Sequence, residues 1–83
     1  MEDKAIIILK IQKTNREYDL EIPLDITAND LVNALNVAFE LGIDTFDSKK
    51  CYLKAVDPIA LLRGNRKLAD YGIRNGTVIN FTD

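Results

Sequence analysis

The sequence predicts an α+β domain in which one helix packs across one face of a mixed sheet of four or five strands, in the order ββαβ(β)β. Three observations support this fold class. Two strand-like segments come first, one segment with helical periodicity follows, and two or three short apolar segments come last. The 83 residues suit one domain, residues 1–83, with one core. In so short a chain the helix and the sheet must bury their apolar faces against each other.

The first two segments predict a β-hairpin. Residues Ala5–Gln12 are rich in isoleucine and form the first strand, and the polar residues Lys13–Arg16 form the turn. Residues Glu17–Ile22 then alternate between apolar and acidic side chains, which predicts a strand with one buried face. The apolar residues of this strand, which are predicted to face the core, are Tyr18, Leu20 and Ile22. Its acidic residues, which are predicted to face solvent and are called the acidic row, are Glu17, Asp19 and Glu21.

The single helix is predicted from Thr27 to about Leu41. Thr27 and Asp30 have the spacing of a capping box, and Gly42 is the predicted C-cap. The side of the helix that faces the core is predicted to hold Leu31, Ala34, Leu35, Ala38 and Leu41. The polar side is predicted to hold Asn33, Asn36 and Glu40. The edges of the apolar arc are predicted to hold Val32, Val37 and Phe39.

The last third predicts two or three short strands. The third strand is Cys51–Val56, which ends at the turn formed by Asp57-Pro58. The segment Ile59–Leu62 is a short fourth strand. After the turn at Asn75-Gly76 the fifth strand runs over Thr77–Phe81.

Composition and charge exclude several classes of function. Eleven basic and thirteen acidic residues give a net charge of −2 without a basic stripe, so we expect no nucleic-acid partner. The chain has no histidine and only one cysteine, Cys51, so we expect neither a disulfide nor a Cys/His metal site. Cys51 is interpreted as a half-buried strand residue in a reducing compartment. The apolar run Ala5–Leu9 is too short for a signal peptide or a membrane span, which predicts a cytoplasmic protein without membrane insertion.

No residue pattern points to catalysis or to a cofactor. No serine or threonine lies in a nucleophile-elbow context, and no glycine-rich loop joins a strand to a helix. The basic turn Arg63–Lys67 has two interpretations, a phosphate contact or a solvated turn. Asp44 and Asp47 on a polar connector make a poor cation site. We therefore expect a protein that is not an enzyme.

Three segments resemble ubiquitin and its β-grasp relatives. Leu68-Ala69-Asp70-Tyr71-Gly72-Ile73 resembles the Leu-Ser-Asp-Tyr-Asn-Ile turn of ubiquitin. Residues Leu20–Thr27 resemble its second strand and the turn into its helix, and "TVINF" resembles its final strand. The resemblance implies a β-grasp fold in which Leu68 and Ile73 fill the core and the hydroxyl of Tyr71 bridges the turn.

Within that superfamily the chain is most similar to the bacterial YukD/EsaB-like proteins, which are encoded with type VII secretion systems of Gram-positive bacteria. The similarity rests on the length, on "LKAV" in the third strand, and on "LADYGIRNGTVI" near the end. It implies a non-catalytic accessory or regulatory protein that binds a protein partner, such as a membrane or ATPase component of the secretion system.

Ubiquitin-like modifiers and sulfur carriers react through a flexible Gly-Gly tail, because only glycine passes the narrow channel of the activating enzyme. Residues Asn80–Asp83 contain no glycine, so we expect non-covalent binding and no conjugation. Two alternatives remain open at this point. One is a modifier or sulfur carrier, and the other is a structural domain that self-associates through Ile6, Ile8 and Val78.

The candidate binding surface is the outer face of the sheet. If Ile7, Leu9 and Ile11 face the core, strand pleating sends the intervening residues outward, beside the last strand. Lys54 takes the position of the central isoleucine in ubiquitin's receptor-binding patch, so we expect no binding by ubiquitin receptors. The candidate residues are Ile6, Ile8, Lys10, Tyr52, Lys54, Val78 and Asn80. Their apolar members have two interpretations, an interaction site or ordinary surface residues of a strand.

Overall fold

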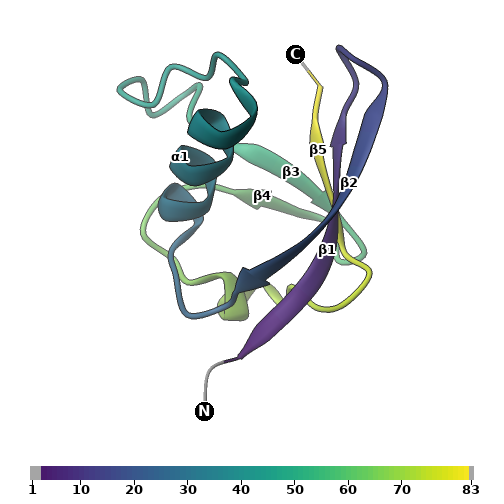
Figure 1. Cartoon of the computed structure of the whole chain (residues 1–83). Helices are drawn as coiled ribbons and strands as arrows, with labels where there is room; N and C mark the ends of the chain where they lie inside the picture. The colour runs from purple at the N-terminus through teal and green to yellow at the C-terminus, as the bar shows by residue number, and fades with distance from the viewer. Residues whose placement is uncertain (1–2, 83) are drawn as a thin grey trace.

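A computed structural model, which describes residues 3–82, consists of a five-stranded mixed sheet with one α-helix across its inner face (Figure 1). The elements are β1 Lys4–Ile11, β2 Arg16–Pro23, α1 Ala28–Phe39, β3 Leu53–Val56, β4 Ala60–Leu62, the 3₁₀ turn η1 Leu68–Tyr71, and β5 Val78–Phe81. The predicted fold class is confirmed, and the predicted strands and helix lie within two residues of these bounds. Of the glycine-free segment Asn80–Asp83, the structure describes the residues up to Thr82, and Asp83 lies outside the described residues.

The strands lie in the order β2-β1-β5-β3-β4. The first and last strands, β1 and β5, are parallel neighbours at the centre, and the other pairs are antiparallel. Ile8 on β1 lies opposite Asp19 on β2 and opposite Val78 on β5, and Val78 in turn lies opposite Val56 on β3. The sheet therefore carries side chains from β1, β5 and β3 in continuous rows, with β2 and β4 at its edges.

The core lies between the inner face of the sheet and α1. Ile7 and Leu9 on β1 are fully buried, whereas Ile6, the residue before Ile7, is 52% exposed. The predicted register of the first strand is therefore confirmed, because a slip by one residue would exchange the two faces. No helix within residues 3–82 has the length and hydropathy to cross a lipid bilayer.

The predicted capping box of α1 is confirmed. The backbone N–H of Asp30 donates to Thr27 Oγ1 at 3.1 Å, and the N–H of Thr27 donates to Asp30 Oδ2 at 3.3 Å. The N–H groups of the two residues between Thr27 and Asp30 donate to backbone carbonyls of the turn at residues 63–67. Ala28 N–H donates to the carbonyl of Arg66, and Asn29 N–H donates to the carbonyl of Gly64. The backbone of this turn thus satisfies N–H groups that a helix start leaves unpaired.

The predicted C-cap at Gly42 is wrong, because α1 ends at Phe39 and Glu40 takes the left-handed C-cap conformation with φ 52°. The side chain of Asn36 accounts for the earlier end. Its amide donates to the carbonyl of Ile43 at 3.1 Å, and its Oδ1 accepts from the N–H of Ile43 at 2.8 Å. These two bonds hold the chain that follows against the last turn of the helix. Asn36 is therefore half-buried and does not lie on a solvated face as predicted.

The predicted core face of α1 is partly wrong. Ala34 and Ala38 are exposed, whereas Val32, which we placed at the edge, is fully buried. The buried helix residues are Ala28, Leu31, Val32 and Leu35. The helix is rotated toward Val32 because burying the larger side chains on that side removes more apolar surface from water than burying two alanine methyl groups.

The roles implied by the resemblance to ubiquitin are confirmed for three residues. Leu68 is 0% exposed and Ile73 is 4% exposed, so both fill the core. The hydroxyl of Tyr71 donates to the carbonyl of Arg63 at 2.9 Å and so bridges the turn before η1.

Cys51 is more buried than predicted. It lies two residues before β3, is 5% exposed, and places its Sγ 3.9 Å from Oδ1 of Asn29 on α1. Burial raises the pKa of the Cys51 thiol, and the negative charge of Asp44 raises it further.

The raised pKa of Cys51 predicts a loss of stability in alkaline solution. Below the ordinary thiol pKa the group is neutral in both the folded and the unfolded chain, so its contribution to stability is fully present. Above that pKa the unfolded thiol ionises first, and the contribution is lost as the pH rises through the folded pKa. Urea denaturation near neutral pH and at about pH 10 should show a smaller alkaline loss in Cys51→Ala than in the wild type. Equal losses in both proteins would contradict the assignment.

Candidate protein-binding face

An apolar row crosses the outer face of the sheet. Ile8, Val78 and Val56 are direct cross-strand neighbours on β1, β5 and β3. Ile6 lies two residues before Ile8 on the same face, and Ile59 follows the turn after Val56. We call Ile6, Ile8, Val56, Ile59 and Val78 the apolar row. Ile6 is 52% exposed, Val56 46% and Ile59 90%, so these side chains present apolar surface to solvent.

A second row, which is mainly polar, runs parallel to the first. Lys10, Asn80 and Lys54 lie opposite one another on β1, β5 and β3, and Leu61 on β4 lies opposite Lys54. Lys10 also contacts Glu17 on β2, with 3.9 Å between Nζ and Oε2. The face is therefore a band of branched aliphatic side chains beside a band of basic and amide groups.

The apolar row ends in a shallow hollow of about 630 Å³ beside β3 and β4. Its apolar lining includes Val56, Ile59 and Leu61, and its polar lining includes Lys54 and Asn80. Leu61 is 43% exposed.

Six of the seven predicted residues lie in these two rows, and Tyr52 does not. Tyr52 precedes β3 and lines a second hollow, which shares Lys54, Asn80 and Thr82 with the first. The residue that lies one strand beyond Val78 is Val56. The sequence could have predicted that Val56 faces outward, because Val56 follows the outward residue Lys54 by two positions in the same strand. The same alternation on β4 would have found Leu61.

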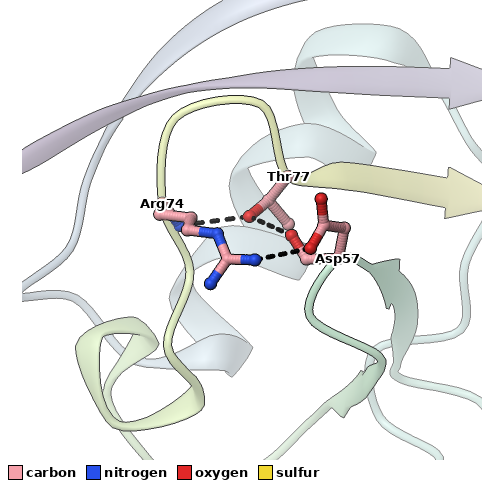
Figure 2. Close-up of polar contacts among 3 residues, drawn as sticks. All are labelled: Asp57, Arg74 and Thr77. Carbon is pink, nitrogen blue, oxygen red and sulfur yellow. Dashed lines mark hydrogen bonds and ion pairs between the residues drawn. The ribbon is translucent and has the colours of Figure 1, made fainter.

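A polar cluster fixes the loops at one end of the apolar row (Figure 2). Thr77 Oγ1 donates to the carbonyl of Asp57 at 2.9 Å and accepts from the backbone N–H of Arg74 at 3.1 Å. The guanidinium of Arg74 forms an ion pair with the Asp57 carboxylate. Thr77 is fully buried, whereas both charged side chains are largely exposed.

This cluster positions three strands relative to one another. Asp57 directly follows Val56 at the end of β3, and Thr77 directly precedes Val78 at the start of β5. The same loop bonds to β1, because the N–H of Ile6 donates to Asn75 Oδ1 at 2.8 Å and the carbonyl of Ile6 accepts from Gly76 at 2.9 Å. The cluster thus sets the spacing of the apolar side chains that flank it.

Comparison with known proteins identifies the family. Residues 6–80 match the family model described as WXG100 protein secretion system (Wss), protein YukD. Comparison with curated protein sequences gives no match.

Solved structures with a similar fold include ubiquitin-like domains. A ubiquitin-like domain from tubulin-binding cofactor B is 20% identical with a TM-score of 0.75, and the alignment covers 96% of this chain and 89% of that one. The C-terminal ubiquitin-like domain of mouse tubulin-specific chaperone e is 12% identical with a TM-score of 0.68, over 99% of this chain and 90% of that one. Tubulin-binding cofactor B of Trypanosoma brucei is 14% identical with a TM-score of 0.64, and the alignment covers 94% of this chain and 92% of that one. These structures agree in fold, and with the match over residues 6–80 they show that the chain is a ubiquitin-like, β-grasp member of the YukD family of the WXG100 protein secretion system.

Proposed function

We propose that this chain is a cytoplasmic accessory or regulatory protein of a type VII secretion system in Gram-positive bacteria, and that it binds a protein partner non-covalently. Membership in the YukD family supports the link to secretion. The binding surface is the apolar row together with the hollow beside β3 and β4. The protein acts by binding and not by catalysis.

The observation that carries this proposal is the continuity of the apolar row. Single apolar residues on a small domain are ordinary and need no function. Here Ile8, Val78 and Val56 adjoin one another across three strands, and Ile59 extends the row beyond them. A contiguous apolar patch with a polar border is typical of a protein interface. This favours the interaction interpretation over scattered surface residues.

The partner that fits the family is a membrane or ATPase component of the secretion system. The exposed row can bury its aliphatic side chains against an apolar surface of such a component, while Lys10, Lys54 and Asn80 form a polar rim. No nucleic acid is proposed, because the face mixes basic residues with aliphatic ones and has no basic stripe.

Affinity capture from the native cell tests this function. The tagged chain is purified in parallel under native and fully denaturing conditions, and both eluates are analysed by mass spectrometry. We expect secretion-system components in the native eluate alone. Conjugates that persist in denaturant would instead support a modifier. Capture of untagged copies of the same chain alone would support the self-associating domain.

A further inference from the structure

We propose a second binding site at the free edge of β2, which borders the apolar row where Asp19 lies opposite Ile8. This edge pairs with an extended segment of a partner protein in which apolar and basic residues alternate. β2 is the terminal strand of the sheet and lies at its margin beside β1 (Figure 1). Among the described residues, no hydrogen bond joins the backbone of Arg16–Pro23 to anything but β1. In an antiparallel pair every second residue of an edge strand directs its N–H and C=O away from its neighbour.

The inner side of this edge offers apolar contact. Tyr18 and Leu20 point toward the core but remain partly exposed, because no further strand covers them. The ring of Tyr18 lies 4.8 Å from that of Phe39 on α1. Beside them is an open hollow of about 470 Å³, which is lined by Leu41 and also by charged residues, including Lys13, Arg16 and Glu40. An added strand would place its inward side chains beside Tyr18 and Leu20, so the residues at those positions should be apolar.

The outer side of the same edge is acidic. Glu17, Asp19 and Glu21 alternate along β2 and are exposed. Lys10 lies 3.9 Å from Glu17 and Lys4 lies 3.6 Å from Glu21, but both lysines are on β1, one strand further from the edge. An added strand therefore has three carboxylates as its nearest cross-strand neighbours. Opposite charges at such positions stabilise strand pairing, so its outward residues should be basic.

The acidic row also argues against a second copy of this chain at the edge. Antiparallel pairing of β2 with itself about Asp19 would place Asp19 opposite Asp19 and Glu17 opposite Glu21. Like charges directly opposite destabilise a sheet, and charged edge strands are a common protection against such pairing. The occupant that fits both sides of the edge is a different chain with alternating apolar and basic residues.

The probe is a capped ten-residue peptide of alternating valine and lysine, and its control is the peptide of alternating valine and glutamate. Each is titrated into the ¹⁵N-labelled full chain and followed by NMR shifts and amide hydrogen exchange. We expect the lysine peptide to bind at least about tenfold more tightly and to protect alternate amides of β2. Asp19→Lys/Glu21→Lys should reverse this preference. The matched variant Asp25→Lys/Asp70→Lys changes the net charge equally at exposed sites outside β2 and should retain the preference of the wild type.

Four outcomes would overturn the proposal. Equal affinity for both peptides, or no shift at millimolar peptide, would show that the edge does not select this chemistry. Shifts confined to the apolar row would place the contact on the outer face. Protection of β2 amides that rises with protein concentration in the absence of peptide would identify a second copy as the occupant.

Discussion

Replacing Ile8 by aspartate is expected to weaken capture of the protein partner at least about thirtyfold, because truncating a central interface residue typically costs about 2 kcal/mol or more. Ile8 lies inside the apolar row, between Ile6 and Val78. Its side chain faces away from the core, so the variant should remain folded. The new carboxylate would lie opposite Asp19, and like charges across a strand pair cost up to roughly 1 kcal/mol. Stability and partner affinity must therefore be measured separately.

Three further variants make this test specific. Ile8→Lys removes the apolar contact but places a charge of opposite sign beside Asp19, so it should lose the partner without the stability cost. Val56→Asp changes a second member of the row and should lose the partner as well. Val37→Asp is the matched control, because Val37 is 79% exposed on α1 and lies outside the outer sheet face. Equal capture by Ile8→Asp and Val37→Asp would contradict the role of the apolar row.

Local sequence patterns were sufficient to predict most of the fold. Strict alternation in β2 and the isoleucine-rich β1 predicted which side chains face the core, although Tyr18 and Leu20 on the edge strand are only partly buried. Thr27 with Asp30 predicted the start of α1. The errors in the helix arose where contacts outside the helical pattern decide the structure. Asn36 bonds to Ile43, seven residues away, and this contact ends the helix before Gly42. No local pattern contains that information.

At the candidate site, too, local patterns predicted some features and contacts between distant residues determined the others. The outward direction of Ile6, Ile8, Lys54 and Asn80 followed from alternation along single strands. Which outward residues become neighbours depends on register between strands that are far apart in sequence. For that reason Tyr52 was assigned to the patch in place of Val56. The cluster of Asp57, Arg74 and Thr77 was missed altogether, because it joins residues 17 and 20 positions apart.

Replacing Thr77 by valine is expected to lower the free energy of unfolding by about 2 to 4 kcal/mol. Valine has nearly the same shape but leaves the carbonyl of Asp57 and the N–H of Arg74 without their partner. Both hydrogen bonds are partly buried, so each lost bond should cost about 1 to 2 kcal/mol, the lower part of the range for fully buried groups. For a domain of this size the melting temperature should fall by roughly 10 °C or more. Thermal unfolding followed by circular dichroism measures this directly.

Two companion variants separate the buried hydroxyl from the surface charges around it. Thr77→Ser keeps both hydrogen bonds and should lose no more than about 1 kcal/mol, the value of a buried methyl group. Arg74→Ala removes an ion pair whose side chains are 63% and 72% exposed, so it should cost less than about 1 kcal/mol. Because Thr77 adjoins Val78 and bonds to the residue after Val56, Thr77→Val should also weaken partner capture more than Arg74→Ala does, even at temperatures where both variants are folded. If Arg74→Ala proved as destabilising as Thr77→Val, the exposed ion pair and not the buried hydroxyl would be what holds β3 and β5 together at this end of the sheet.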